Sequence, residues 1–163
     1  MALTDLAQQF RDAMARVPAP VTIITTTDEH GNPHGTTVSA FASLSVTPPM
    51  VVFALDNRGA MRDKIALAGQ VGINVLAADQ AEIAIRFAQP GLRFDATRWH
   101  LHDGVPRIDG VAAFLVCDQV ELLPGGDHTV VIGRVLHAES AGDRSLSYHL
   151  RAFHAVPPED AAQ

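Results

Sequence analysis

The sequence predicts a mainly β protein, in which a barrel of strands is covered by a few α-helices. Strand-like runs follow one another over short turns, and they are too numerous and too closely linked for a doubly wound α/β fold. No βαβ repeat of about 30 residues appears. The 163 residues are the size of one domain, which can bury a core without disulfides. We expect this domain over 1–156 and a flexible tail over 157–163.

The composition restricts the partners of the chain. Its formal net charge is −6 and it has a single lysine, Lys64, so nucleic acid is not expected as a partner. One anionic cofactor is still compatible with this charge, because an arginine and backbone amides can hold a phosphate. No apolar run approaches the roughly 20 residues that cross a bilayer, and the start of the chain lacks the basic region of a signal peptide. Together with a lone cysteine, these features favour a cytoplasmic protein without a membrane partner.

The first elements follow from periodicity and turn residues. Apolar residues from Leu6 to Val17 recur at helical spacing and predict a helix, which Pro18 and Pro20 end. The run VTIITTT is β-branched, and the turn DEHGN with a second run rich in Thr and Val completes an expected hairpin. The apolar run MVVFAL at 50–55 predicts a buried strand, which the polar residues DNRG end.

The middle of the chain predicts two more helices with a strand between them. Met61 and Ile65 share one helical face, and Gly69 ends that helix before VGINVL returns to strand character. Asp79, followed three residues later by Glu82, is typical of a capping box at the start of the next helix.

The last third of the sequence predicts a loop and two long strands. Residues 90–110 show no clear periodicity, so we expect an irregular loop that lies over a site. The strand candidates VAAFLVCDQVELL and HTVVIGRVLHAES follow, with the turn PGGD between them. Cys117 lies within the first of them and is expected to be a buried, unreactive thiol.

Common signatures of cofactor and catalytic sites are absent from the sequence. It has no GxGxxG, GxxxxGKS/T, GxSxG or HExxH pattern, so any cofactor is held in another way. The most unusual stretch runs from Gly35 to Ser45, where small and hydroxylic residues alternate with apolar ones at strand spacing. Small side chains allow a flat heteroaromatic ring to approach while backbone N–H and C=O groups pair with its edge. The alternative is that Thr and Ser simply populate an exposed face.

Three segments together resemble a known family. GTTVSAFASLSVTPPMVVFAL, INVLAADQAEIAIRFA and GDHTVVIGRV resemble, in order and spacing, the flavin reductase family of FMN-binding split barrels, over about Phe10 to Phe153. The resemblance implies an FMN-binding split β-barrel of Greek-key type and a homodimer with sites between subunits. It also implies a reductase component that supplies a two-component flavin monooxygenase. The implied reaction moves hydride from C4 of NADH or NADPH to N5 of FMN, with FAD as the alternative flavin.

The resemblance also assigns ligand-binding residues. A backbone N–H near flavin N1 would stabilise the negative charge of the reduced ring, and hydride transfer strictly requires no side-chain acid or base. A phosphate at a helix N-terminus gains free N–H donors, and an arginine adds a charge-assisted contact. The implied flavin ligands are Thr37, Val38, Ser39, Ala40, Ser45, Asp56, Asn57, Arg58, Gly59, Met61, Asn74, Arg86 and Phe87, and the implied NAD(P)H ligands are His128 and Tyr148.

Taken alone, several of these residues have simpler interpretations. Arg58 is compatible with a solvated loop arginine, Phe87 with helix core and Arg86 with a side chain that lies along the surface. His128 is compatible with a strand-edge histidine bonded to the backbone, and Tyr148 with a packing residue.

The sequence departs from the family pattern at two places, and it contains an incomplete metal-binding pattern. The chain has LRAF at 150–153 where the family commonly has Gly-Arg-Tyr, which affects the nucleotide end of the site, and PVT at 20–22 in place of Gly-Val-Thr. His100 and His102, followed by Asp103, resemble the start of a metal site, but the sequence shows no third ligand, so we expect no metal.

Two other functions are compatible with the sequence. One is an FMN-binding module that stores or senses the flavin without turnover. The other is an oxidase of the pyridoxamine-phosphate type, which the scarcity of basic residues for a second phosphate disfavours. Steady oxidation of NADH with added FMN distinguishes a reductase from both.

Overall fold

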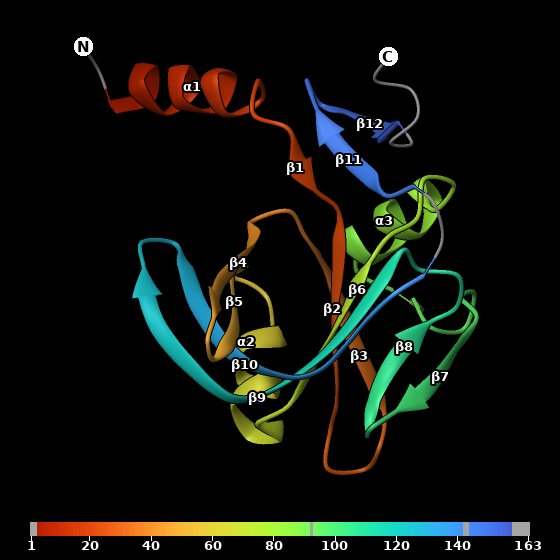
Figure 1. Ribbon diagram of the computed structural model, residues 1–163. Helices are drawn as coiled ribbons and strands as arrows, with labels where there is room; N and C mark the ends of the chain where they lie inside the picture. Colours follow the sequence, from red (N-terminus) through yellow and green to blue (C-terminus); the bar gives the residue numbers. More distant parts are fainter. Residues whose placement is uncertain (1–2, 92, 142–143, 158–163) are drawn as a thin grey trace.

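The computed structural model describes residues 3–91, 93–141 and 144–157. Within these ranges the helices are α1 (Leu3–Met14), α2 (Met61–Ala68) and α3 (Ala81–Ala88). The strands are β1 (Ala19–Pro20), β2 (Thr22–Thr27), β3 (Pro33–Val38), β4 (Phe41–Val46), β5 (Pro49–Asp56), β6 (Val71–Val75), β7 (Trp99–His102), β8 (Val105–Ile108), β9 (Ala113–Gly125), β10 (His128–Ser140), β11 (Leu146–His149) and β12 (Ala152–Ala155). The fold is mainly β with few helices, as predicted (Figure 1).

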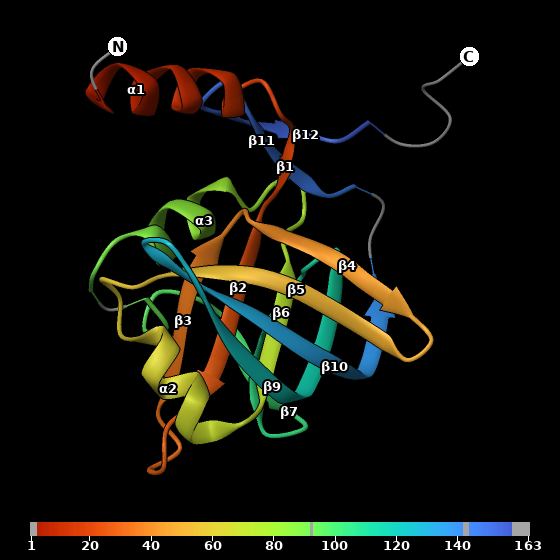
Figure 2. The same ribbon diagram turned by 90° about the vertical axis from the view of Figure 1, so that its left-hand side faces the viewer.

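Seven strands form one curled antiparallel sheet in the order β3-β2-β6-β9-β10-β5-β4. The long strands β9 and β10 bend, because their register shifts between Ile132 and Arg134 and again between Val135 and His137. Gly133 lies at the first shift, where an added Cβ would be 3.0 Å from Cβ of Cys117. The bent strands turn the sheet into the half-open barrel seen in Figures 1 and 2.

Two helices cover apolar clusters of this barrel. α2 buries Met61 and Ile65 in one cluster, and α3 buries Ala84 and Phe87 in the other. Phe87 packs so closely on β3 that a Cβ on Gly35 would be 2.8 Å from its ring. Glycine at this position therefore allows α3 to dock on the sheet.

A small sheet of β1, β11 and β12 stands beside the barrel, next to α1 (Figure 1). The β11–β12 turn places Leu150 and Arg151 at φ values of 49° and 63°. The N–H of Leu150 donates to the carbonyl of Ala15 at 2.7 Å, and Arg151 forms an ion pair with Asp12. The residues that depart from the family pattern thus tie the hairpin to the end of α1.

The unusual stretch from Gly35 to Ser45 is not the single strand that its alternation predicts. β3 ends at Val38, and β4 begins at Phe41 on the opposite edge of the seven-stranded sheet. Residues 39–40 carry the chain across, because β3 pairs with β2 while β4 pairs with β5. Local alternation could not reveal this crossing, since both strands have the same period.

The prediction of an irregular loop over 90–110 is wrong in part. β7 and β8 pair as a hairpin, and its turn is Asp103-Gly104, at φ values of 49° and 83°. Asp-Gly is a strong signal for a two-residue hairpin turn, although here it lies in a stretch without clear periodicity. The hairpin covers the α3-side cluster with Val105 and Ile108.

The predicted capping box is also wrong. The N-cap of α3 is Gln80, and no side chain caps the helix. The Gln80 amide instead accepts from the N–H of Ala77 at 2.9 Å and donates to the carbonyl of Asp109 at 2.8 Å. A long-range contact to Asp109 thus replaces the local one that the sequence favoured.

Two further expectations concern burial and the chain end. Cys117 is fully buried, which confirms the predicted burial, and burial together with the charge of Asp118 raises the pKa of its thiol to about 12, which disfavours the reactive thiolate. Apart from Pro157, the expected tail lies outside the described residues. In the described ranges, no helix combines the length and the apolar character needed to cross a membrane.

Candidate functional site

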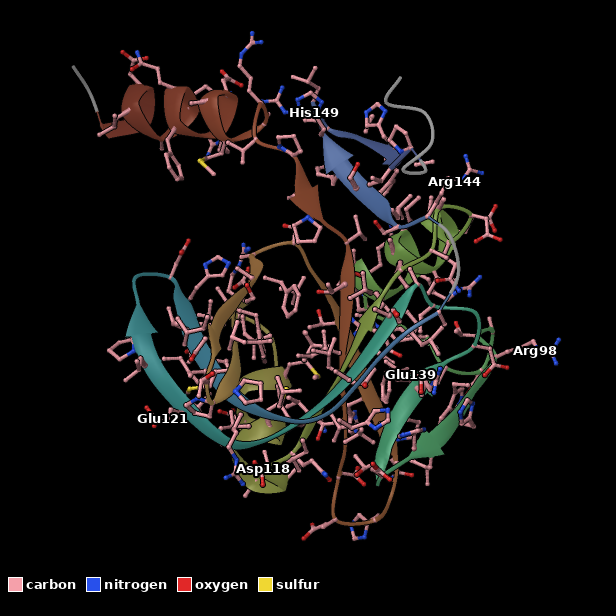
Figure 3. All side chains as sticks on the ribbon, in the orientation of Figure 1. Arg98, Asp118, Glu121, Glu139, Arg144 and His149 are labelled. Atoms are coloured by element: carbon pink, nitrogen blue, oxygen red, sulfur yellow. The ribbon has the colours of Figure 1, made fainter. Side chains whose placement is uncertain are left out.

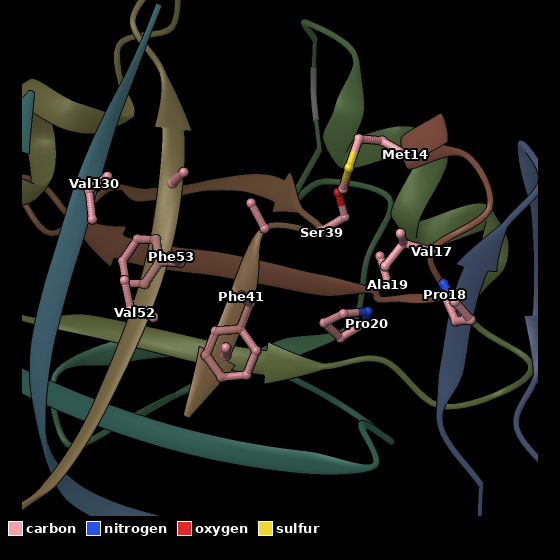
Figure 4. A pocket seen from close by; sticks show the side chains of 13 residues that line it. Met14, Val17, Pro18, Ala19, Pro20, Ser39, Phe41, Val52, Phe53 and Val130 are labelled. Carbon is pink, nitrogen blue, oxygen red and sulfur yellow. The ribbon is translucent and has the colours of Figure 1, made fainter. Parts of the chain in front are cut away.

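An apolar groove of about 460 Å³ lies between the α1–β1 segment and the outer face of β4 and β5 (Figure 4). Met14 and Val17 face Ser39 across the groove. Small side chains, including those of Ala40 and Ala54, line much of it. The groove is therefore shaped for a flat ligand that needs close access to the backbone.

Two backbone donors are free in this groove. Ser39 and Ala40 are exposed, and their carbonyls accept from the N–H groups of Phe41 and Ala54, each at 3.0 Å. In the described part of the chain, nothing accepts a hydrogen bond from the N–H of Ser39 or of Ala40. Because both residues are exposed, these N–H groups are accessible to a ligand that has acceptors along one edge.

Polar residues follow the groove-lining residues along β5 and β10, and we call this part the polar end of the groove. Ala54 of β5 pairs with Val130 of β10, and two residues further along Asp56 pairs with His128. Residues two apart on a strand share a face, so Asp56 and His128 lie on the same outer face as the apolar pair. The fold thus brings together one residue implied for the flavin and one implied for the nicotinamide nucleotide.

The polar end carries an exposed arginine on a loop. Nη2 of Arg58 lies 2.5 Å from Oδ2 of Asp56, and its side chain is 91% exposed. The hydrogen bonds from Arg58 hold the pKa of Asp56 well below its usual range, and the carboxylate in turn raises the pKa of Arg58. Such an exposed pair is weakly held, so a phosphate can compete for the guanidinium.

The neighbouring residues position this loop. Oδ1 of Asn57 accepts from Oγ1 of Thr129 at 2.7 Å, and the N–H of Asn57 donates to the carbonyl of Asp127 at 3.1 Å. Nδ1 of His128 lies 2.7 Å from Oδ1 of Asp127, whose pKa is lowered mainly by that hydrogen bond. Gly59 is exposed in the same loop.

Thr37, Val38, Ser45 and Met61 are only partly available to a ligand. The Thr37 hydroxyl donates to the carbonyl of Ala84 at 2.6 Å, and Val38 is buried. Ser45 is half-buried at the bulge of β4. Met61 is buried as well, so its backbone rather than its side chain is accessible at the start of α2.

Three residues implied to lie beside the flavin are used elsewhere in this chain. Asn74 has no exposed surface: its amide donates to the carbonyls of Ile23 and Pro106, and its Oδ1 accepts from the N–H of Ile108 at 2.8 Å. Phe87 is fully buried in the core. Arg86 donates from Nη1 to the carbonyl of Ala96 at 2.7 Å. None of the three lines the groove, because Asn74 and Phe87 are buried and Arg86 is bonded to the loop after α3.

A second hollow of about 480 Å³ continues the groove towards β11. Tyr148 lines it, with Phe153 as a ring neighbour at 5.1 Å. Arg11 and Arg151 also line it; the sequence drew attention to Arg151 only within the LRAF departure and did not single out Arg11. Arg151 lies in the turn after Tyr148, whereas the docking of the β11–β12 hairpin on α1 brings Arg11 to the same hollow.

A comparison with known families identifies the chain. The pattern described as "Flavin reductase like domain" matches residues 14–157. The chain belongs to the flavin reductase family. The groove is lined by residues 39–42, which belong to the Gly35–Ser45 stretch for which the resemblance implied a ligand-binding surface.

Curated relatives of this family are similar over most of the chain. An NADH-dependent flavin reductase from Rhodococcus is 38% identical over 90% of this chain and 85% of its own length. The FMN reductase (NADH) of Agrobacterium fabrum is 34% identical over 90% of this chain and 84% of its own length. A probable flavin reductase from Rhizobium meliloti is 36% identical over 85% of this chain, which spans only 45% of that longer protein.

Solved structures in the family have the same fold. A homologue of nitrilotriacetate monooxygenase component B from Mycobacterium thermoresistibile superposes with a TM-score of 0.91 at 31% identity, covering 97% of this chain and 90% of its own. An NADH:FAD oxidoreductase from Streptomyces globisporus, in complex with NAD and FAD fragments, gives a TM-score of 0.89 at 28% identity, with 98% of both chains covered. These similarities confirm the predicted fold class of the flavin reductase family.

Proposed function

We propose that the chain is a reductase that transfers hydride from NADH to FMN bound in the groove. The observation that carries this proposal is that the exposed N–H groups of Ser39 and Ala40, on a wall of small residues, have no acceptor within the described ranges. NADH is favoured over NADPH because two of the relatives described above are named for NADH. FAD is the alternative flavin, since one structural neighbour was solved with FAD fragments.

Each end of the groove has a separate task in this proposal. When bound, the flavin supplies N5 as the hydride acceptor for C4 of the nicotinamide. The N–H groups of Ser39 and Ala40 donate to the pyrimidine edge of the ring, where preorganised donors stabilise the charge of the reduced form. No side chain has to supply a proton, which agrees with the apolar floor of the groove.

The phosphate is proposed to bind at the polar end. The first turn of α2 leaves N–H groups available, because its N-cap residue, Ala60, makes no side-chain cap. Arg58 adds a charge-assisted contact when it swings from Asp56 to the phosphate. His128 and Tyr148 are proposed to approach the nicotinamide nucleotide from the strand end and from the second hollow.

A homodimer is part of the proposal. α1 and the turn after it expose a row of apolar side chains, from Leu6 (53%) through Phe10 (62%) and Met14 (48%) in the helix to Val17 (50%) in the turn. The outer face of β4, β5 and β10 is uncovered by the described helices, as Figure 2 shows. A second copy that packs on both would bury this surface and close the groove.

The dimer is tested by sedimentation velocity on Phe10→Glu. A buried charge at the interface is expected to yield monomers that bind flavin poorly. Leu67→Glu is the matched control, because Leu67 is an 89% exposed apolar residue of α2, and it should remain dimeric. A wild type that sediments as a monomer would contradict this part of the proposal.

The partner is proposed to be a flavin-dependent monooxygenase in a reducing, cytoplasmic compartment. One relative, from Rhodococcus opacus, is named as the reductase component of a 4-nitrophenol monooxygenase and is 36% identical over 94% of this chain. The lone buried cysteine supports the compartment.

Anaerobic stopped-flow mixing with NADH is the experiment that tests the reductase. Bleaching of the flavin absorbance, followed by steady NADH oxidation in air with added FMN, is the expected result. Bound flavin that is never bleached would support the storage module instead. Flavin that is bleached by an amine substrate but not by NADH would support the oxidase.

A further inference from the structure

Two histidines that are far apart in the sequence meet outside the flavin groove. His102 ends β7, and His137 lies on β10, where the β7–β8 hairpin folds over the sheet. Their ring centroids are 4.7 Å apart. Asp103, in the hairpin turn, completes a group in which one ligand atom from each residue lies within 4.8 Å of the others. The fold therefore supplies the third ligand that the sequence did not show.

The two histidine side chains are partly sheltered, and within the described residues the ring of His102 has no hydrogen-bond partner. The side chains of His102 and His137 are 26% and 33% exposed. His102 packs against the ring of Phe114, and its contact to Asp103, at 3.8 Å, is too long for a hydrogen bond. An imidazole held in place by packing, with its nitrogens unbonded, is a ready metal ligand.

A carboxylate and an arginine support the ring of His137. Oε2 of Glu139 lies 3.4 Å from Nε2 of His137, and the other oxygen of Glu139 pairs with Arg107 of β8. Figure 3 shows Glu139 beside β8 in this part of the barrel. A carboxylate next to a histidine fixes the orientation of the ring, which is the usual support for a metal-binding histidine.

We propose that His102, Asp103 and His137 bind a Zn²⁺ ion, with Glu139 as a positioning residue. Two imidazoles and one carboxylate are a common zinc ligand set, with a fourth position left for water. Tetrahedral ligands at normal zinc distances are roughly 3.3 Å apart, so the side chains must close by about 1.5 Å. Asp103, whose side chain is 63% exposed, is free to make most of this movement. The ion would link the hairpin turn to β10.

Equilibrium dialysis of tag-free protein against Zn²⁺ tests the site, with Co²⁺ absorbance as a second measurement of the coordination. We expect one ion per chain, a tetrahedral Co²⁺ spectrum, and a melting temperature that rises with Zn²⁺. His137→Gln and the surface variant Asp103→Asn should each weaken binding at least tenfold, and Glu139→Gln by about 10–100-fold.

The matched control is His100→Gln on the same strand. His100 is 54% exposed and bonds to Asp109, outside the cluster, so this variant should bind Zn²⁺ as the wild type does. The proposal is overturned if wild-type protein takes up no zinc, or if uptake survives in both His137→Gln and Asp103→Asn. It is also overturned if His100→Gln loses zinc as fully as they do.

Discussion

The groove and the core beneath the β7–β8 hairpin use their polar groups in opposite ways. Beneath the hairpin, Asn74 and Thr25 are fully buried and bonded to the backbone, for example from Oγ1 of Thr25 to the carbonyl of Pro106 at 2.6 Å. In the groove, the N–H groups of Ser39 and Ala40 have no acceptor in the described residues. The first region satisfies its polar groups within one chain, whereas the second leaves backbone donors accessible to solvent or to a bound ligand.

The largest expected effect is that of Asn74→Ala, which removes a buried hydrogen-bonding group from the core beneath the β7–β8 hairpin. It leaves the N–H of Ile108 without its acceptor and opens a void, so we expect the free energy of unfolding to fall by about 2–4 kcal/mol. Urea unfolding measures this loss. The folded variant should keep its FMN affinity. A variant of normal stability that no longer binds FMN would instead show that Asn74 contacts the flavin.

Gly35→Ala tests the docking of α3 on the sheet. The added Cβ would lie 2.8 Å from the buried ring of Phe87, and such overpacking is expected to cost about 1–3 kcal/mol. Gly59→Ala is the matched control, because its Cβ would meet only the carbonyl oxygen of Asp56 at 3.5 Å. Equal urea midpoints for the two variants would mean that β3 and α3 have more room than the contact indicates.

Arg58→Ala tests the proposed phosphate contact at the polar end of the groove. Stability should hardly change, because the side chain is 91% exposed. FMN affinity should fall about tenfold or more, the cost of a charged hydrogen bond to phosphate, while riboflavin affinity stays unchanged. Fluorescence titration measures both. Arg98→Ala, which removes a 93% exposed arginine just before β7, is the control, and equal losses for FMN and riboflavin would contradict a phosphate contact.

His128→Ala has the smallest expected effect. Losing one polar contact to the nicotinamide nucleotide should raise KM for NADH about threefold to tenfold and leave the dissociation constant of FMN unchanged. Steady-state kinetics and flavin titration separate the two quantities, with His30→Ala on the β2–β3 hairpin as control. Unchanged kinetics would remove His128 from the nucleotide site.

Sequence patterns located the groove better than they located the individual contacts. The small residues around Ser39 were singled out because their composition is unusual, and they do line a groove. Asn74 and Phe87 carry no local sign of their burial, since an amide and an aromatic ring occur in cores and in sites alike. Arg151 was noticed only as a departure from the family pattern, because its partner Asp12 lies far away in the sequence.

By itself, the sequence determined the mainly β class, the positions of most strands and the helices with their stops, because periodicity and turn chemistry act over a few residues. Only the tertiary structure decided that residues 39–40 cross the barrel, that Asp56 lies opposite His128 and that His137 meets His102. Strand register and hairpin docking depend on packing between segments distant in the chain, and no local pattern contains that information.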